Sequence, residues 1–400
     1  MIIAGHLVDE AMFSYIASHA DADTHKLLLK AEPSLTFDKS FAILQIECRK
    51  RSKNKIPELL GNGRFLFPKS ISAEQCTHEA VAQFHANQFG SEDRVLDMTM
   101  GLGVDDYYIA QRVKSLVTIE LDPEIAQVGQ YNFLQLNPSV TVVQGDSAEF
   151  LQHYDDDKFD AIFIDPARRG DSGKRLYGLA DCQPNVLDLL PVIRDHAKRL
   201  YVKASPMIDV TQSVRDFGEA LTDVWAVSVK NECKELFFRL DFDNSQTEIN
   251  LHAIGYDGEW QDFTTHYSTE QTVPNFAEPE PGNYLYEPNS SVMKLACFSA
   301  LAQHYSANSI AQNSHLFVSD VMLDDFPGRR FVIQEVIPFK DRMIKDLAKR
   351  YEQMNVATRN FRLKAVELKR RLKVRDGGNI YLFATTLADG AQVLLLCHKT

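Results

Sequence analysis

The chain has 400 residues, 44% of them hydrophobic, and a formal net charge of −12. This length predicts two to four domains, and the negative charge argues against a protein coated in basic surface. No apolar run approaches the length of a membrane span, and the six cysteines form no CxxC pair or Cys/His cluster. We therefore expect a cytoplasmic globular protein without a disulfide framework, a metal site or a membrane segment.

Residues 1–88 are predicted to form a mostly helical region, either a separate small domain or a helical cap on the next one. Helical periodicity runs through 14–31, and Ser72 with Gln75 has the spacing of a capping box that begins a helix. Residues 40–51 fit either a strand or a helix. Basic residues gather at 49–55, which indicates a polyanion site or a solvated helix face.

Residues 89–245 alternate short apolar strands with helical segments. This alternation predicts an α/β domain with a doubly wound, Rossmann-like parallel sheet. The last two strands, near 224–229 and 234–242, are separated by only a few residues and are expected to form an antiparallel hairpin.

Residues 246–329 are predicted to be a connecting region. It begins with a strand, continues in a long loop or linker at 257–282 and holds a helical segment at 290–305. Residues 330–400 are expected to form a compact α+β module in the order strand, helix, strand, helix, strand, strand.

Several acids and glycines follow the predicted strands of 89–245. Asp97, Gly101 and Gly103 come after the first strand, in a turn that is neither a dinucleotide fingerprint nor a P-loop. Glu120 ends the second strand, where an acid can accept from ribose hydroxyls. Asp146 and Ser147 follow the third strand and Asp165 the fourth. Ligands bind at the carboxyl ends of the strands in open parallel sheets, so these residues are expected to share a site.

These positions, taken in order, resemble class I S-adenosylmethionine-dependent methyltransferases. The resemblance implies a seven-stranded sheet whose last strand is antiparallel. It also implies that S-adenosylmethionine is bound by Asp97, Gly101, Gly103, Glu120, Asp146, Ser147 and Asp165. The structural alternatives are that Asp97 caps a turn, Glu120 is a solvated strand end and Asp146 forms an Asx turn.

The segment 165–168 reads DPAR, which is similar to the [DN]-P-P-[FYW] motif of methyltransferases that act on exocyclic amines. The resemblance implies catalytic roles for Asp165, Pro166 and Arg168, although Arg168 replaces the aromatic residue. RNA 5-methyluridine methyltransferases are similar at this strand end, but Ala204 stands where their nucleophilic cysteine belongs, which disfavours covalent pyrimidine chemistry. Lys203 and Arg169 are predicted to contact the substrate.

The C-terminal segment 330–400 resembles the THUMP-like domain of a group of bacterial methyltransferases with a DPARR motif. That group also carries a ferredoxin-like piece before this domain, and residues 283–329 fit its place. Residues 340–375 hold thirteen Lys/Arg against four Asp/Glu. Basic side chains here are predicted to contact RNA phosphates without reading sequence, namely Arg359, Arg362, Lys364, Arg370 and Arg371.

Together these features predict a methyltransferase that uses S-adenosylmethionine and acts on a base nitrogen of structured RNA, either tRNA or rRNA. One alternative keeps the cofactor but has a small molecule or a protein as substrate. The other is an RNA-binding protein whose cofactor fold is degenerate. The expected partner is RNA, with no metal and no membrane.

Overall fold

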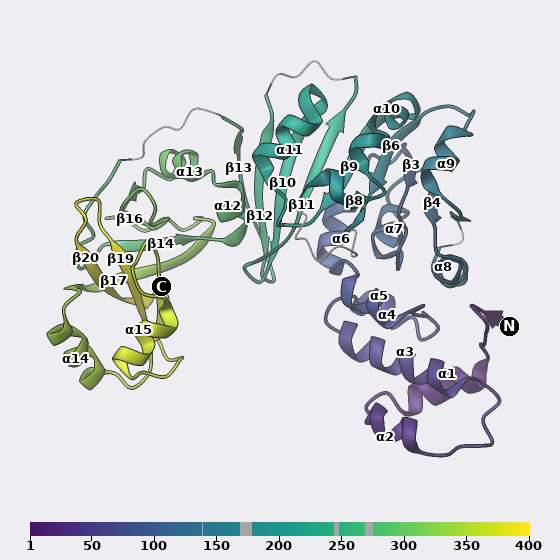
Figure 1. Ribbon diagram of the computed structural model, residues 1–400, viewed down its shortest axis with the longest axis horizontal. Coiled ribbons are helices and arrows are strands. Elements are labelled where there is room, and N and C mark those ends of the chain that lie inside the picture. The colour runs from purple at the N-terminus through teal and green to yellow at the C-terminus, as the bar shows by residue number, and fades with distance from the viewer. Residues whose placement is uncertain (138, 169–177, 244–247, 269–274) are drawn as a thin grey trace. The chain divides into compact units, whose positions relative to one another are not determined.

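The computed structural model describes residues 1–137, 139–168, 178–243, 248–268 and 275–400. The chain divides into two compact units (Figure 1). Unit 1 comprises Met1–Thr222 and Leu236–Thr247, and unit 2 comprises Asp223–Glu235 and Glu248–Thr400.

Unit 1 begins with a two-stranded ribbon and six helices. These are β1 (Ile2–Ile3), β2 (His6–Leu7), α1 (Glu10–Ser18), α2 (Thr24–Leu29), α3 (Lys39–Ser52), α4 (Pro57–Gly61), α5 (Ser70–Gln75) and α6 (Glu79–Ala86). Asp9, Asp23 and Asp38 cap α1, α2 and α3 by accepting from first-turn N–H groups. The segment 40–51, which fitted a strand or a helix, lies in α3.

This helical region is a cap on the sheet domain. Its buried cluster includes Met12 and Phe41 together with Val128 and Tyr131 of the later helix α8 (Pro123–Leu136). The Asn132 side chain of α8 also pairs with the backbone N–H and C=O of Leu66, at 2.9 Å each. Apolar burial and a satisfied buried amide therefore hold the region to the sheet domain.

The α/β part of the chain, which comprises the rest of unit 1 and the β10–β11 hairpin (residues 221–241) that is divided between the two units, follows the predicted alternation. Its elements are β3 (Arg94–Asp97), α7 (Val104–Ile109), β4 (Ser115–Glu120), α8, β5 (Val140–Gln144), α9 (Ser147–Gln152), β6 (Phe159–Ile164), β7 (Ala167–Arg168), η1 (Leu179–Asp181), β8 (Cys182–Gln183), α10 (Val186–His196), β9 (Ala197–Ala204), α11 (Val210–Phe217), η2 (Gly218–Ala220), β10 (Leu221–Val229) and β11 (Glu232–Asp241).

The strand order through the main sheet is β5-β4-β3-β6-β9-β11-β10. Parallel pairing joins β5, β4, β3, β6 and β9, and β11 runs antiparallel to β9. The β10–β11 turn consists of Lys230 and Asn231, both with positive φ, as a two-residue hairpin requires. This is the seven-stranded class I methyltransferase order, and the expected fold class is confirmed.

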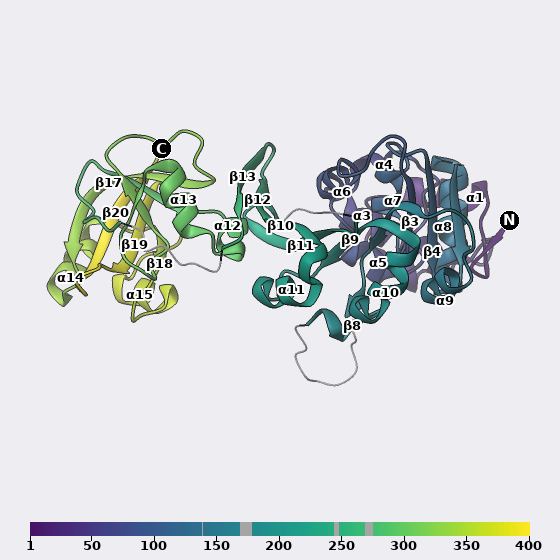
Figure 2. The same cartoon turned by 90° about the horizontal axis from the view of Figure 1, so that it is seen from above.

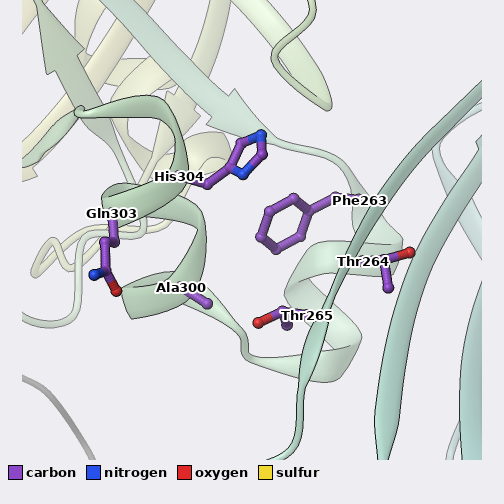
Figure 3. A pocket seen from close by; sticks show the side chains of 6 residues that line it. All are labelled: Phe263, Thr264, Thr265, Ala300, Gln303 and His304. Carbon is purple, nitrogen blue, oxygen red and sulfur yellow. The ribbon is translucent and has the colours of Figure 1, made fainter.

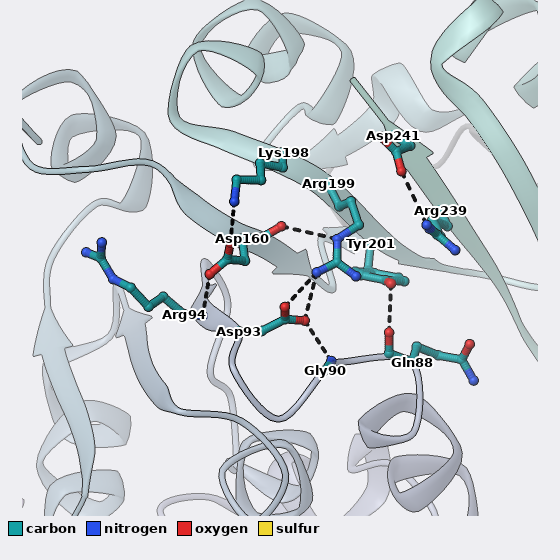
Figure 4. A network of polar contacts seen from close by, with 10 residues as sticks. All are labelled: Gln88, Gly90, Asp93, Arg94, Asp160, Lys198, Arg199, Tyr201, Arg239 and Asp241. Atoms are coloured by element: carbon teal, nitrogen blue, oxygen red, sulfur yellow. Dashed lines mark hydrogen bonds and ion pairs between the residues drawn. The ribbon is translucent and has the colours of Figure 1, made fainter. Parts of the chain in front are cut away.

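Polar contacts join β3, β6 and β9 of the sheet (Figure 4). Arg199 Nη2 lies 2.8 Å from both carboxylate oxygens of Asp93, and Lys198 Nζ lies 2.7 Å from Asp160. The Tyr201 hydroxyl donates to the carbonyl of Gln88 at 2.8 Å. These contacts lie at the start of β3 and β9, away from the carboxyl ends where a ligand is expected.

Unit 2 continues the sheet past β10 with β12 (Asn250–Tyr256) and β13 (Trp260–His266). The long loop predicted for 257–282 is therefore partly wrong, because β13 pairs antiparallel with β12 across its whole length. Only Phe263 of β13 is buried, so this edge strand lacks the alternating hydrophobicity that would have revealed it.

A second sheet of seven strands, in the order β15-β16-β14-β17-β20-β19-β18, lies in the rest of unit 2. Its elements are β14 (Tyr284–Pro288), α12 (Ser290–Leu295), α13 (Phe298–Tyr305), β15 (Asn308–Ser309), β16 (Phe317–Ser319), β17 (Gly328–Pro338), α14 (Asp341–Arg350), β18 (Asn355–Thr358), α15 (Ala365–Leu372), β19 (Ile380–Thr386) and β20 (Gln392–Lys399). Figure 2 shows the strands β17, β18, β19 and β20 of this sheet with the helices α14 and α15. The predicted element order of 330–400 is confirmed.

Period-two alternation along β20 explains the two cores of this second sheet. Leu395 and Cys397 enter one buried cluster, whereas Leu394 and Leu396 enter the other with Leu347 of α14 and Leu368 of α15. The helices α14 and α15 therefore cover one face of the sheet.

Candidate active site

The turn after β3 brings together the first three predicted cofactor residues. Asp97 Oδ1 accepts from the backbone N–H of Thr99 at 2.7 Å and from its hydroxyl at 3.3 Å. Gly101 has φ +57°, and a Cβ built there would meet only the Thr99 carbonyl, at 4.0 Å. Gly103 has φ +77°, and its Cβ would lie 2.9 Å from the Phe133 ring. Gly101 thus borders open space, whereas Gly103 is required for packing on α8.

Glu120, at the end of β4, holds this glycine turn. Its Oε2 accepts from the N–H of Gly101 at 2.9 Å, and its Oε1 accepts from the N–H of Asp122 at 2.8 Å. Burial raises the pKa of the Glu120 carboxyl. Each carboxylate oxygen can accept a second hydrogen bond, so the clamp leaves capacity for a ligand hydroxyl.

Asp146 and Ser147 begin α9 at the end of the third parallel strand. Asp146 is exposed, and its Oδ1 caps the helix by accepting from Ala148 N at 2.8 Å and Glu149 N at 3.2 Å. Ser147 is buried. The hydrogen bond from Ala148, two residues on, is that of the Asx turn given as the alternative for Asp146. That this acid also contacts a cofactor stays a prediction.

Asp97 has a second buried carboxyl group beside it, Asp106 of α7. Asp97 is 1% exposed and Asp106 0%. Burial raises the pKa of Asp97 to about 7, and burial together with the charge of Asp97 raises the pKa of Asp106 well above its usual range. Thr118 donates to Asp106 Oδ2 at 3.0 Å, while Oδ1 has no donor. A proton shared by the two carboxyls satisfies this arrangement.

Asp165 and Pro166 lie directly after β6, beside the glycine turn. The N–H of Asp165 donates to the Thr99 hydroxyl at 2.7 Å, and Thr99 in turn contacts Asp97. The Asp165 side chain is 39% exposed, while Pro166 is buried. The fold therefore connects the predicted acceptor carboxylate to the predicted cofactor turn through one threonine.

Lys203, at the end of β9, faces Asp165 and not open solvent. Its Nζ lies 2.5 Å from Asp165 Oδ2, 2.9 Å from Thr77 Oγ1 and 3.7 Å from Asp105 Oδ2. Asp105 Oδ1 lies 2.8 Å from Nδ1 of His85, a residue with no exposed surface. Although burial opposes it, the ammonium of Lys203 and the hydrogen bond from His85 hold the pKa of Asp105 below its usual range.

Sequence reasoning missed Thr77, His85 and Asp105. The expected helix starting at Ser72 is wrong: α5 runs from Ser70 to Gln75, and α6 begins at Glu79 with His78 as its cap. Thr77 lies between these two helices, and its hydroxyl oxygen accepts a hydrogen bond from Lys203. Asp105 had a visible signal, because it follows the glycine turn at the start of a helix, but its partners are distant in sequence.

Arg168 and Arg169 remain predictions. The backbone of Arg168 belongs to the short strand β7, which pairs with β8. Arg169 lies outside the described residues, as does the side chain of Arg168.

The basic residues of the C-terminal module differ in their surroundings. Arg359 pairs at 2.8 Å with Glu287, a side chain only 3% exposed that also pairs with Arg329, so the guanidinium of Arg359 is engaged in a contact within unit 2. The Arg362 guanidinium lies 4.9 Å from the centroid of the Phe339 ring and is exposed. The remaining predicted RNA contacts are exposed and have no acidic partner among the described residues, namely Lys364, Arg370 and Arg371.

The basic segment 49–55 is mostly engaged in structural contacts. Arg49 donates to the carbonyls of Gly63 and Phe65, Arg51 pairs with Glu74, and Lys55 donates to the carbonyl of Glu74. These contacts favour a structural role over a polyanion site.

A separate hollow of about 230 Å³ lies in unit 2, between β13 and α13 (Figure 3). Its lining is formed by Phe263, Thr264, Thr265, Ala300, Gln303 and His304. None of the predicted site residues belongs to it. Across the described ranges, no three His, Cys, Asp or Glu side chains are placed to hold a metal ion, and no helix has the length and apolarity to cross a membrane.

Comparisons with known proteins agree with this architecture. Residues 328–399 match a family model described as THUMP domain-like, and residues 284–327 match one described as a ferredoxin-like domain. A solved structure of a proposed methyltransferase from Porphyromonas gingivalis W83 has a TM-score of 0.88 at 29% identity and covers 98% of this chain and 100% of its own. Uncharacterized S-adenosylmethionine-dependent methyltransferases from two Mycobacterium tuberculosis strains are 22% identical over 368 residues, 88% of this chain and 93% of theirs.

Proposed function

We propose that this protein methylates a base nitrogen of structured RNA such as tRNA or rRNA. The chain is a class I, S-adenosylmethionine-dependent methyltransferase with a C-terminal THUMP-like domain, and the proposal concerns its substrate. The observation that carries the proposal is the half-exposed Asp165 carboxylate beside the glycine turn, joined to it through Thr99. A carboxylate in this place suits an acceptor that presents an N–H group.

The residues around the glycine turn fit S-adenosylmethionine in their chemistry. The open space beside Gly101 allows a ligand to approach the backbone closely. Asp97 would favour the cationic amino-acid part, Glu120 would accept from ribose hydroxyls, and Asp146 would accept from the adenine amine. When bound, the cofactor supplies a methyl group already activated by its sulfonium.

The residues of the chain then need only position the acceptor and stabilise charge. Asp165 would accept a hydrogen bond from the acceptor nitrogen and hold it in line with the methyl group. Its negative charge would stabilise the positive charge that develops on the nitrogen as the N–C bond forms and the C–S bond breaks. The excess proton would leave the methylated nitrogen through Asp165 or to water.

The exposed cations of the THUMP-like domain support RNA over a small molecule. Lys364 precedes α15, whereas Arg370, Arg371 and Lys373 lie at its C-terminal end, and all four are exposed. Guanidinium and ammonium groups in this setting bind phosphates without reading sequence. Such a surface therefore favours a polyanionic substrate over a small molecule.

The proposal is tested by transfer of labelled methyl from S-adenosylmethionine to total RNA from a strain that lacks the gene. RNA from the parent strain and the Asp165→Ala protein are the negative controls, and Asp156→Ala, at an exposed acid, is the matched active control. Label should enter only the RNA from the deletion strain and should be lost with Asp165→Ala. Nucleoside analysis then identifies the base. Absence of label with a protein that binds the cofactor would contradict an RNA substrate.

A further inference from the structure

The ammonium of Lys203 is held between two carboxylates and a hydroxyl group. Lys203 Nζ lies 2.5 Å from Asp165 Oδ2, 2.9 Å from Thr77 Oγ1 and 3.7 Å from Asp105 Oδ2. The Lys203 side chain is 11% exposed, so its charge depends on these partners and not on water. A lysine confined in this way has little freedom to change its position.

Asp105 is itself held by contacts with two further side chains. The Thr77 hydroxyl donates to its Oδ2 at 2.5 Å, and His85 contacts its Oδ1 at 2.8 Å. The Asp105 side chain is 12% exposed and its pKa is held below the usual range, so it stays an anion. Thr77 and His85 come from the N-terminal helical region, which therefore forms part of the wall of this site.

We propose that Lys203 is a positioning residue that orients the Asp165 carboxylate toward the methyl acceptor, and that Asp105, Thr77 and His85 hold Lys203 in place. This inference rests on the function proposed above. Asp165 is then fixed at two points, through its backbone N–H by Thr99 and through its Oδ2 by Lys203.

The charges of the cluster explain why Asp105 is needed. A Lys203–Asp165 pair alone would be neutral and would offer little stabilisation to a nitrogen that becomes positive. Asp105 adds a second carboxylate beside the ammonium, so the Lys203 charge is shared between two anions and does not cancel that of Asp165 alone. The site can thus hold an ordered carboxylate and still favour a cationic transition state.

The first test needs no substrate. Lys203→Met, Asp165→Asn and the double variant form a thermodynamic cycle measured by thermal unfolding. Lys198→Met is the matched control, because Lys198 is on the same strand and pairs with Asp160 at 2.7 Å but is 56% exposed. Melting temperatures should be non-additive for Lys203 with Asp165 and additive for Lys198 with Asp165. Additive changes at Lys203 would overturn the inference whatever the substrate is.

The second test measures methyl-transfer kinetics with the unmethylated form of the RNA that the label-transfer experiment identifies as the substrate. Lys203→Met and Asp105→Asn should lower kcat by about 10²-fold, with cofactor affinity measured by calorimetry unchanged within about threefold. The acidic limb of the pH–rate profile should move to higher pH in Lys203→Met, because ionised Asp165 loses its adjacent cation. Lys203→Arg should recover part of the rate.

The outcomes separate the two proposals. Loss of rate in proportion to loss of folded protein, with an unmoved pH profile, would mean a purely structural lysine and would overturn the inference. A coupled cycle in a protein that methylates no RNA would support the Lys203–Asp165 arrangement and overturn the proposed substrate. Thr77→Ser should retain activity and Thr77→Val should lose it, which keeps the inference testable if Lys203→Met does not fold.

Discussion

The carboxyl group of Asp97, at the end of β3, is buried beside the carboxyl group of Asp106 in α7. Burial raises the pKa of Asp97 from 3.8 to about 7. The folded protein therefore binds more protons than the unfolded chain between about pH 4 and pH 7. Ionising the Asp97 carboxyl costs more free energy in the folded protein than in the unfolded chain. The free energy of unfolding should therefore fall as the pH rises through this window.

Asp106→Asn should reduce this pH dependence, because the pKa of the Asp106 carboxyl is also raised by burial and its share of the proton uptake on folding is lost. The amide keeps the size of the side chain, accepts from Thr118 and can donate to Asp97 without a bound proton. We expect the free energy of unfolding at pH 8 to rise by about 1–3 kcal/mol, with little change at pH 4. Denaturant titrations across this range measure it, with Asp156→Asn at an exposed acid as the control. An unchanged pH slope in Asp106→Asn would contradict the shared proton.

The two glycines after β3 should respond differently to a methyl group. Gly103→Ala places a Cβ 2.9 Å from the Phe133 ring at φ +77°, so it should lower the melting temperature of the free protein clearly. Gly101→Ala meets open space at φ +57° and should cost only about 1 kcal/mol of backbone strain. Calorimetry should nevertheless show weaker S-adenosylmethionine binding for Gly101→Ala. Normal cofactor affinity in that variant would place the cofactor elsewhere.

The sequence was enough to predict the features of the fold that depend on local patterns of residues. Apolar strands followed by Asp97, Glu120 and Asp165 were enough to predict the parallel sheet and the edge at which these acids gather, because strand ends carry that information directly. The edge strand β13 escaped, since one buried residue, Phe263, leaves no periodicity. Lys203 was expected near the substrate, but its contact with Thr77 joins residues 126 positions apart. Only the folded chain reveals such pairs.

Arg199 should matter more for stability than an exposed arginine in a similar pair. Its side chain is 21% exposed and reaches both oxygens of Asp93, itself 13% exposed. Arg199→Met leaves a largely buried carboxylate without its partner and should lower the free energy of unfolding by about 2–4 kcal/mol. Arg51→Met is the matched control, because the Arg51–Glu74 pair is about half exposed, and it should cost less than about 1 kcal/mol. Equal losses of unfolding free energy for the two variants in urea titrations would contradict a larger contribution from the Arg199–Asp93 pair.

Arg370 and Arg371, in the last turn of α15, should contribute to RNA affinity through phosphates. The double variant Arg370→Ala/Arg371→Ala should weaken binding to RNAs of different sequence by similar factors. It should also reduce the slope of log affinity against log salt by roughly 1.4 to 1.8, because two fewer counterions are released. Arg112→Ala/Arg215→Ala removes the same charge from exposed positions outside the THUMP-like domain and should leave the slope unchanged. Fluorescence anisotropy at several salt concentrations measures both. Equal slopes for the two double variants would show that α15 makes no specific contribution to RNA binding.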